Sequence, residues 1–134
     1  MGREKKMTRK KNPEYYEPRD WYPYLKAMEL LEGKGFGGIY WIRFGKAIPY
    51  PKGKSRVIYI GKSEVNIRRR LKEHLQKRDE PGKCIMQQAS VEELEVGVEV
   101  VLERSLVHQR EQELLGAFQK KFGKLPECNS FRLR

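Results

Sequence analysis

An arginine and a histidine, Arg70 and His74, lie four residues apart beside a run of regularly spaced apolar residues. Ile67, Leu71 and Leu75 form the apolar stripe of an expected helix, with Asn66 as its N-cap and its end near residue 78. An arginine at the rim of a core needs a partner, and a planar guanidinium can bind a phosphate with two parallel hydrogen bonds. A histidine one turn later could donate to that phosphate or transfer a proton. The alternative is an ordinary basic amphipathic helix with a capping histidine.

A later segment places a carboxylate among apolar residues. Residues 105–122 predict a helix that begins after the N-cap Ser105 and ends before Gly123. Its apolar positions are Val107, Leu114, Leu115, Phe118 and Phe122. Glu111 falls on that apolar face, whereas Glu113 points toward the solvated side. Burying a carboxylate is costly unless a cation compensates its charge, so Glu111 is the candidate metal ligand and Glu113 the alternative.

Two tripeptides precede these helices, Gly-Ile-Tyr at 38–40 and Tyr-Ile-Gly at 59–61. Each lies in an apolar run that is rich in β-branched and aromatic residues, as strands are. The intervening segment 45–55 contains too many glycines, prolines and lysines to continue a strand, so we expect a loop there. The two runs therefore predict a β-hairpin that brings Tyr40 and Tyr59 close together.

The tripeptides, together with the elements that follow them, resemble the signature of the GIY-YIG nuclease family. Segment 59–71 is similar to the family's second triplet, which is followed by a Gly-Lys-Ser step, an Asn-apolar step and an arginine before an apolar residue. The resemblance assigns the family's arginine to Arg70 and the histidine of several family branches to His74. It assigns the metal-binding glutamate to Glu111 and the final asparagine, which follows a proline-containing turn, to Asn129.

The resemblance implies a small α/β (α+β) fold in which helices flank a three-stranded, mostly antiparallel sheet. It also implies divalent-metal-dependent hydrolysis of phosphodiester bonds in DNA, with Glu111 holding one Mg²⁺ or Mn²⁺ and Arg70 binding the scissile phosphate. Asn129 would brace the site through hydrogen bonds. Further contacts to nucleic acid are expected from basic residues near these elements, namely Lys62, Arg68, Arg69, Lys52 and Lys54.

The same resemblance leaves the general base open among three side chains. Tyr40, assisted by His74 or Tyr59, would orient or deprotonate the attacking water. A free tyrosine has a pKa of ~10. Tyr40 as a base would therefore need a nearby cation, such as Lys62 or Arg70, to lower its pKa.

Composition favours an anionic partner. The chain of 134 residues has 29 Lys and Arg against 18 Asp and Glu, which gives a formal net charge of +11. No segment is apolar enough to span a bilayer, so no membrane is expected. Cys84 and Cys128 lack the spacing and the companions of a zinc site or a disulfide framework. We therefore expect free thiols and an intracellular location, in the cytoplasm, nucleoid or nucleus.

Two other classes of function fit the same composition. One is a non-catalytic nucleic-acid-binding module that retains the fold, and the other is a basic structural protein such as a ribosome-associated factor. The complete set of family elements favours the nuclease, because a degenerate member should have lost the glutamate or the arginine. The oligomeric state, monomer or homodimer, is not determined by the sequence.

The chain is expected to divide at about Phe36 into an N-terminal part, 1–35, and a nuclease-like domain, 36–134. Residues 1–11 are a basic arm without apolar periodicity that could follow a DNA backbone or only keep the protein soluble. A helix is expected from the cap Asp20 to Gly33, with Pro23 in its first turn. Its apolar stripe would be Trp21, Leu25, Met28 and Leu31, and the aromatic residues near it would pack on the domain or stack on bases.

The remaining sequence predicts one more strand and one long connection. Leu94, Val96, Val98 and Val100 alternate with polar residues or glycine, which indicates a third strand over 94–104. Residues 79–93 contain a Pro-Gly pair and are expected to form a loop followed by a short helix from Ser90.

Overall fold

The computed structural model of the chain describes residues 14–129, so the basic arm expected at 1–11 lies outside the described residues. The helices are α1 (Tyr24–Leu30), α2 (Ile67–Leu75), α3 (Glu80–Gln88) and α4 (Val107–Phe122). The strands are β1 (Tyr22–Pro23), β2 (Gly38–Tyr50), β3 (Gly53–Ser63) and β4 (Glu95–Val100). Short 3₁₀ turns, Val91–Glu93 and Arg104–Leu106, precede β4 and α4. Within the described range, no helix has both the length and the apolar character needed to cross a membrane.

The strands form one antiparallel sheet with the order β1-β4-β2-β3. The sheet has four strands and not the expected three, because β1 adds a two-residue edge. In this edge Tyr22 pairs with Val96 and Pro23 with Glu95. Two residues are too few to produce a periodic pattern, so the sequence could not indicate this strand. At the opposite edge, β3 pairs with β2.

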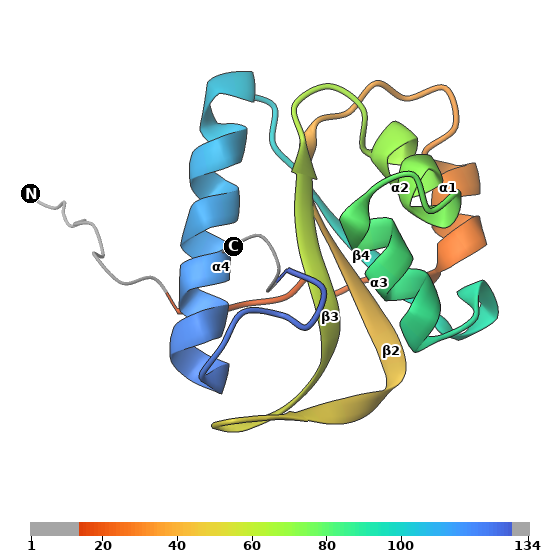
Figure 1. Ribbon diagram of the computed structural model, residues 1–134. Coiled ribbons are helices and arrows are strands. Elements are labelled where there is room, and N and C mark those ends of the chain that lie inside the picture. The colour runs from red at the N-terminus through yellow and green to blue at the C-terminus, as the bar shows by residue number, and fades with distance from the viewer. Residues whose placement is uncertain (1–13, 130–134) are drawn as a thin grey trace, which may run out of the picture.

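Helices cover both faces of the sheet, as Figure 1 shows: α4 lies on one face, and α1, α2 and α3 lie on the other. Successive side chains of β2 alternate between the two resulting cores. Tyr40 and Ile42 belong to the core under α1–α3, and Ile39 and Trp41 belong to the core under α4. Two separate cores therefore meet at one sheet.

The predicted hairpin is confirmed, but its strands are longer than the sequence indicates. β2 continues to Tyr50 and β3 starts at Gly53, so only a two-residue turn remains of the loop expected at 45–55. β4 pairs with β2 only between Gly38 and Arg43, and the rest of the hairpin projects as a two-stranded ribbon (Figure 1). The Tyr50 hydroxyl donates to the Val57 carbonyl at 2.8 Å, which helps to hold the ribbon despite its prolines.

The two helices that carry the candidate residues form close to where the sequence predicts them. The Asn66 side chain accepts a hydrogen bond from the Arg69 amide at 3.0 Å and caps α2, as expected. α4 begins one residue later than predicted, because Ser105 belongs to the preceding 3₁₀ turn and does not cap the helix. The apolar residues predicted for α4 are all buried, and Gly123 ends the helix in a left-handed conformation with φ of 92°.

The N-terminal helix differs from its prediction in both its start and its buried face. α1 starts at Tyr24, so Asp20 does not cap it and Pro23 precedes it. Tyr24, Ala27 and Met28 are its buried residues, whereas Leu25 is exposed. The short strand β1 fixes the chain just before Tyr24, and this shifts the helix and rotates its apolar stripe.

Two expectations for the segment after α2 are wrong. Most of 79–93 is not a loop: α3 occupies Glu80–Gln88, with Asp79 as its N-cap and Pro81 in its first turn, while the short helical turn after Ser90 is confirmed. Cys84 of α3 and Cys128 form a disulfide, with a Cα–Cα distance of 5.6 Å, so neither is a free thiol. The fold brings together two cysteines whose spacing gave no signal, and the inference of a reducing compartment loses its basis.

Candidate active site

The pairing of β2 with β3 places the two tyrosines of the tripeptides on the same face of the sheet. Gly61 lies opposite Tyr40 and Tyr59 lies opposite Ile42, so Tyr59 shares the face of Ile42 and Tyr40. The register shifts after Ile42, so Ile58 is an extra residue in β3, and this bulge adds Ile58 to the same face. All three residues, Tyr40, Ile58 and Tyr59, belong to the core under α1–α3, and the centroids of the two tyrosine rings lie 6.1 Å apart.

Gly61 gives these two rings the space that they occupy. A Cβ atom added at this position would lie 2.7 Å from the Tyr40 hydroxyl oxygen and 2.6 Å from Cε2 of Tyr59. Such distances are far below ordinary van der Waals contact. The final glycine of the second tripeptide is therefore required by the two tyrosines that the tripeptides contribute.

Tyr40 begins a chain of polar contacts that leads from the sheet to α2 and on to α3. Its hydroxyl lies 2.6 Å from Nε2 of His74, and Nδ1 of His74 lies 3.1 Å from Oδ1 of Asp79. Tyr40 and His74 are fully buried. The His74 ring also meets Tyr59 edge to face, with the ring centroids 5.2 Å apart. The predicted helix therefore does bring its histidine to the tyrosine pair.

Burial sets the protonation of this pair. It raises the pKa of Tyr40 well above 10.0, with a further increase from Tyr59, and Arg70 only partly opposes it. The condition for Tyr40 to act as a base, a pKa lowered by a nearby cation, is therefore not met, because desolvation of the phenolate outweighs the attraction of the guanidinium. Burial also lowers the pKa of His74 below 6.5, although Asp79 acts in the opposite direction. At neutral pH both side chains are uncharged.

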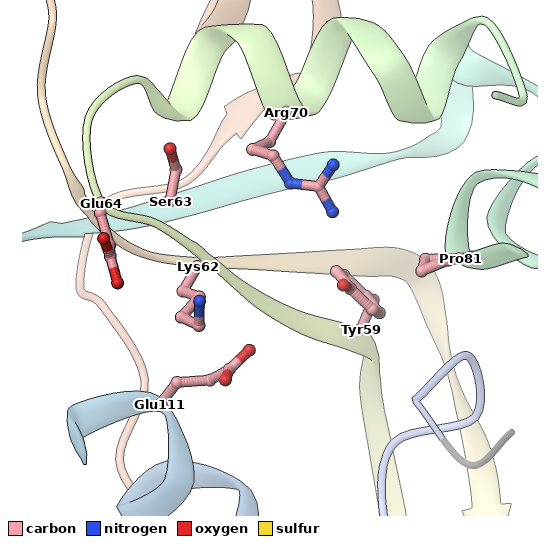
Figure 2. A pocket seen from close by; sticks show the side chains of 7 residues that line it. All are labelled: Tyr59, Lys62, Ser63, Glu64, Arg70, Pro81 and Glu111. Atoms are coloured by element: carbon pink, nitrogen blue, oxygen red, sulfur yellow. The ribbon is translucent and has the colours of Figure 1, made fainter. Parts of the chain in front are cut away.

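Arg70 lies on the same helix as His74 and forms ion pairs with two carboxylates. Its NH1 donates to Glu73 of the same helix and lies 3.4 Å from Oδ2 of Asp79. Burial alone would lower the pKa of Arg70, but Tyr40 and Glu73 raise it, so the guanidinium stays charged. The side chain is about one-third exposed, and Figure 2 shows its guanidinium pointing into a pocket.

This pocket lies along the edge strand β3 and has a volume of about 590 Å³. It is lined by Tyr59, Lys62, Ser63, Glu64, Arg70, Pro81 and Glu111. Arg70 reaches it from α2 on one side of the strand, and Glu111 reaches it from α4 on the other (Figure 2). The strand edge thus joins a cation and a carboxylate that belong to opposite faces of the sheet.

Glu111 suits a divalent cation that keeps most of its water. Its side chain is 0 % exposed among the apolar residues of α4, yet it lines the pocket, and Gln112 donates to its Oε1 at 3.3 Å. The described residues contain no group of three or more His, Cys, Asp or Glu that could enclose a metal. Mg²⁺ is usually bound by one or two carboxylates together with waters and substrate phosphates. Glu111, with Glu64 in the same pocket, therefore fits such an ion.

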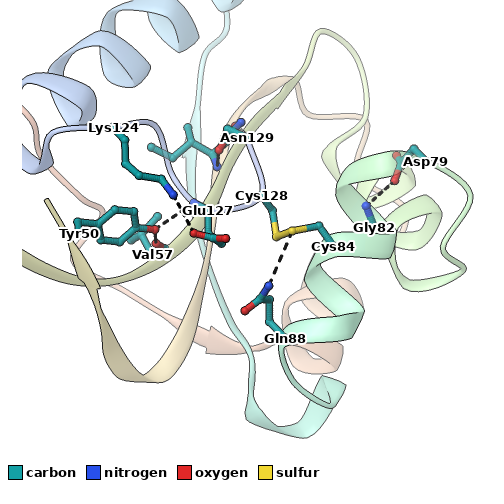
Figure 3. Close-up of a disulfide and its surroundings, with 11 residues drawn as sticks. Tyr50, Val57, Asp79, Gly82, Cys84, Gln88, Lys124, Glu127, Cys128 and Asn129 are labelled. Carbon is teal, nitrogen blue, oxygen red and sulfur yellow. Dashed lines mark hydrogen bonds and ion pairs between the residues drawn. A yellow bond between two sulfur atoms is a disulfide. The ribbon is translucent and has the colours of Figure 1, made fainter. Parts of the chain in front are cut away.

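Asn129 supports the site from behind and does not line the pocket. Its Oδ1 accepts from the Ile60 amide at 2.9 Å, and its Nδ2 donates to the Ile60 carbonyl at 3.0 Å. Cys128 donates its amide to the Ile58 carbonyl at 2.8 Å and forms the disulfide with Cys84 (Figure 3). The end of the described chain thus holds the middle of β3, which carries the second tripeptide.

The other basic residues predicted to contact nucleic acid occupy different surroundings. Lys62 lines the pocket. Arg68 donates to the Met28 carbonyl of α1 at 2.9 Å, and the exposed Arg69 pairs with Glu73. Lys52 and Lys54 are exposed at the turn of the projecting ribbon, away from the pocket. Only Lys62 of this set therefore joins Arg70 and Glu111 in the pocket.

Sequence reasoning missed Asp79, which contacts both Arg70 and His74. A signal was present: Asp79 is followed by Glu80, Pro81 and Gly82, and an aspartate before Glu-Pro is typical of a helix start. The Pro-Gly pair by itself predicts a turn, and this hides the capping role of Asp79 and its proximity to His74.

The family model of the GIY-YIG catalytic domain matches residues 36–124, which include β2, β3, α2, α3, β4 and α4. Neither the comparison with curated proteins nor the comparison with solved structures found a match. The matched range contains both tripeptides, Arg70, His74 and Glu111, and Asn129 lies beyond its end. The family match covers most of the chain and agrees with the order of these elements, so the protein belongs to the GIY-YIG family of nucleases.

Proposed function

We propose that this protein is an endonuclease that hydrolyses phosphodiester bonds in DNA with a divalent metal ion, Mg²⁺ or Mn²⁺. The observation that carries the proposal is the position of Arg70 and Glu111 on opposite sides of one pocket at the edge of β3. A phosphate between them would meet a guanidinium on one side and a carboxylate-bound cation on the other. The net charge of +11 supports a polyanionic substrate.

Different residues of the pocket would bind the phosphate and the metal ion. Arg70 would bind the scissile phosphate with guanidinium N–H groups other than those engaged by Glu73 and Asp79. Lys62, which points from β3 toward Glu111 in Figure 2, would add a second positive charge. Glu111 would hold the metal ion, which when bound supplies a positive charge that stabilises the leaving oxygen.

The buried pair Tyr40 and His74 would accept the proton of the attacking water. Because Tyr40 is a neutral phenol with a raised pKa, it would accept a proton from the water only as it passes its own proton to Nε2 of His74. Tyr59 lines the pocket in front of Tyr40 and would orient the water. Among the three candidates for the base, this proposal makes His74 the final acceptor and Tyr40 the relay.

The proposal is tested by cleavage of labelled DNA in Mg²⁺. Glu111→Gln and Arg70→Ala should each reduce the cleavage rate by about a thousandfold, because each removes stabilisation of charge in the transition state. Chelation of the metal should stop cleavage, and added Mg²⁺ should restore it. A panel of intact, nicked, flapped and four-way duplexes would reveal the preferred DNA structure.

Two matched controls lie on the same helices. Glu113→Gln removes a carboxylate from the outer side of α4, and Lys72→Ala removes an exposed cation from α2. Both variants should cut at rates close to that of the unchanged protein. Unchanged cutting by Glu111→Gln would contradict the site. DNA binding without cutting in any metal would favour the non-catalytic module instead.

A further inference from the structure

Asp79 is placed where three donors converge on one carboxylate. Its Oδ1 accepts from the Gly82 amide at 2.8 Å and lies 3.1 Å from Nδ1 of His74. Its Oδ2 lies 3.4 Å from NH1 of Arg70. One side chain therefore caps α3 and contacts two residues of α2 that the proposed reaction uses.

The first turn of α3 packs closely against the backbone of His74, which holds Asp79 next to the imidazole. A Cβ atom added at Gly82 would lie 2.6 Å from the His74 carbonyl oxygen, 2.8 Å from its Cα and 2.8 Å from Oδ1 of Asp79. Only a glycine fits there, and its amide is one of the donors that hold the carboxylate. Gly82 thus packs against the backbone of His74 while Asp79 contacts its imidazole, and together they fix the position of the ring.

We propose that Asp79 is a positioning residue that fixes His74 as the tautomer with its proton on Nδ1, so that Nε2 faces Tyr40 as an acceptor. A carboxylate can only accept hydrogen bonds, so Nδ1 must be the protonated nitrogen of a neutral ring. Nε2 then carries a lone pair, and the Tyr40 hydroxyl donates to it. The role in catalysis rests on the proposed nuclease activity, whereas the tautomer itself does not.

The proton transfer balances with groups that are already in place. The O–H bond of Tyr40 breaks as an N–H bond forms at Nε2 of His74, and the water that Tyr40 serves replaces the phenolic proton. The imidazolium so formed keeps its proton on Nδ1 and donates it in a hydrogen bond to Asp79. The negative charge of Asp79 compensates the new positive charge of the ring. Without that carboxylate, the charged ring would be buried beside the cation Arg70.

The groups around the imidazole have opposing effects on its charge. Arg70 opposes protonation of the ring, and Glu73 and Asp79 favour it. From the sheet the imidazole faces Tyr40, a neutral phenol, and the ring of Tyr59. The pKa of Asp79 is lowered: burial alone would raise it, but the hydrogen bond and charge of His74, the Gly82 amide and Arg70 outweigh burial. The carboxylate therefore stays charged at neutral pH.

The tautomer can be measured directly, because the chain has only 2 histidines. Long-range ¹H–¹⁵N NMR spectra of the protein without DNA or metal should show one neutral ring protonated on Nδ1. That ring is assigned as His74 through its loss in His74→Gln, with the exposed His108 of α4 as the internal reference. A His74 ring protonated on Nε2 would overturn the proposal without any Asp79 variant.

Asp79→Asn tests the charge, because asparagine keeps a capping oxygen for Gly82 but carries no negative charge. The pKa of His74 should fall in this variant, since an amide cannot compensate an imidazolium. The single-turnover cleavage rate should drop at least about tenfold, and the acidic limb of its pH profile should move to lower pH with the pKa of His74. Glu80→Gln, which removes the neighbouring exposed carboxylate paired with Lys83, should change neither measurement.

The two levels of the proposal can fail separately. An unchanged His74 pKa in Asp79→Asn would overturn the positioning role, whatever the protein cuts. A lowered His74 pKa with no shift of the acidic limb would overturn the link between Asp79 and the reaction. If the protein cuts no DNA but the NMR results are as expected, the nuclease proposal fails and the assignment of Asp79 to the tautomer stands.

Discussion

Tyr40 and His74 share a hydrogen bond in a place where neither carries a charge in the resting protein. Both are fully buried, and burial moves their pKa values in opposite directions, each toward the neutral form. A proton can pass between them only if the charges that appear are compensated nearby. The charge of Arg70 favours the phenolate of Tyr40, and Asp79 contacts the His74 ring, so each charged form has a partner of opposite sign within the same cluster.

The same burial predicts how stability depends on pH. Because the pKa of His74 is lower than 6.5 in the folded protein, the unfolded chain binds more protons as the pH falls below that value. The free energy of unfolding should therefore be greatest above pH 6.5 and should decrease toward pH 5. For a single proton the slope cannot exceed about 1.4 kcal/mol per pH unit. Urea unfolding at a series of pH values measures it.

Two variants assign that slope to its residue. His74→Gln should flatten the dependence between pH 5 and 6.5, whatever it does to stability at neutral pH. His108→Gln removes the exposed histidine of α4 and should keep the slope. A slope that survives in His74→Gln would show that another group causes it. Asp79, whose pKa is lowered from 3.8, contributes only at lower pH.

At the scale of elements, the parts of the site that sit on regular helices were predictable. The four-residue spacing of Ile67 and Leu71 fixes which side of α2 faces the core, and this determines where Arg70 and His74 lie. The same reasoning on α4 places Glu111 on the buried face. A helical position depends on neighbours three and four residues away, so a local pattern is sufficient.

Features that depend on distant partners were not predictable from these patterns. The bulge that adds Ile58 to the face of Tyr40 and Tyr59 arises from the pairing of two strands, and the pairing of β1 depends on β4. The disulfide depends on how α3 approaches the end of the chain. α3 was missed because Pro81 and Gly82 are turn residues in most contexts, and the capping by Asp79 reverses that meaning here.

The close fit of Gly61 against the rings of Tyr40 and Tyr59 gives a prediction with an internal control. Gly61→Ala should move the tyrosine rings, because a Cβ would collide with both, and should destabilise the fold by about 1–3 kcal/mol. DNA cleavage should fall with the displaced Tyr40 hydroxyl. Gly116→Ala, in α4 with no atom within 4 Å of the new Cβ, should instead stabilise the protein by about 0.5–1 kcal/mol.

Urea unfolding and cleavage assays on both glycine variants provide the measurement. The two substitutions add the same methyl group, so their difference reports only the surroundings. Equal effects of Gly61→Ala and Gly116→Ala on stability would contradict the close approach of Tyr40 and Tyr59 to the backbone of β3.

In the whole molecule, the site lies at the edge of the sheet and contains residues from the helices on both faces, α4 on one and α1–α3 on the other. α2 contributes the arginine from one face and α4 contributes the glutamate from the other, with β3 between them. Neither layer holds the site alone. The relative position of the layers therefore matters, and the disulfide between α3 and the segment after α4 joins the two along the chain.

That disulfide should contribute measurably to stability. It links cysteines separated by 44 positions, and its reduction should lower the free energy of unfolding by about 2–4 kcal/mol, because the unfolded chain regains the entropy of an open loop. Urea unfolding with and without reductant measures the change, and thiol counting verifies the redox state. The double variant Cys84→Ser/Cys128→Ser should match the reduced protein. Equal stability of the oxidised and reduced forms would contradict a structural role for the bond.

The bond between Cys84 and Cys128 also closes a covalent ring of chain that contains β4 and the whole of α4. The turn after β4 is the open part of that ring, since Leu102 is 90 % exposed, and exposed turns are where proteases cut. A cut at this turn would divide the backbone between Arg70 and Glu111, yet the two fragments would stay joined through the sulfurs. In the oxidised protein, therefore, an intact backbone is not required to keep the two halves of the site on one molecule.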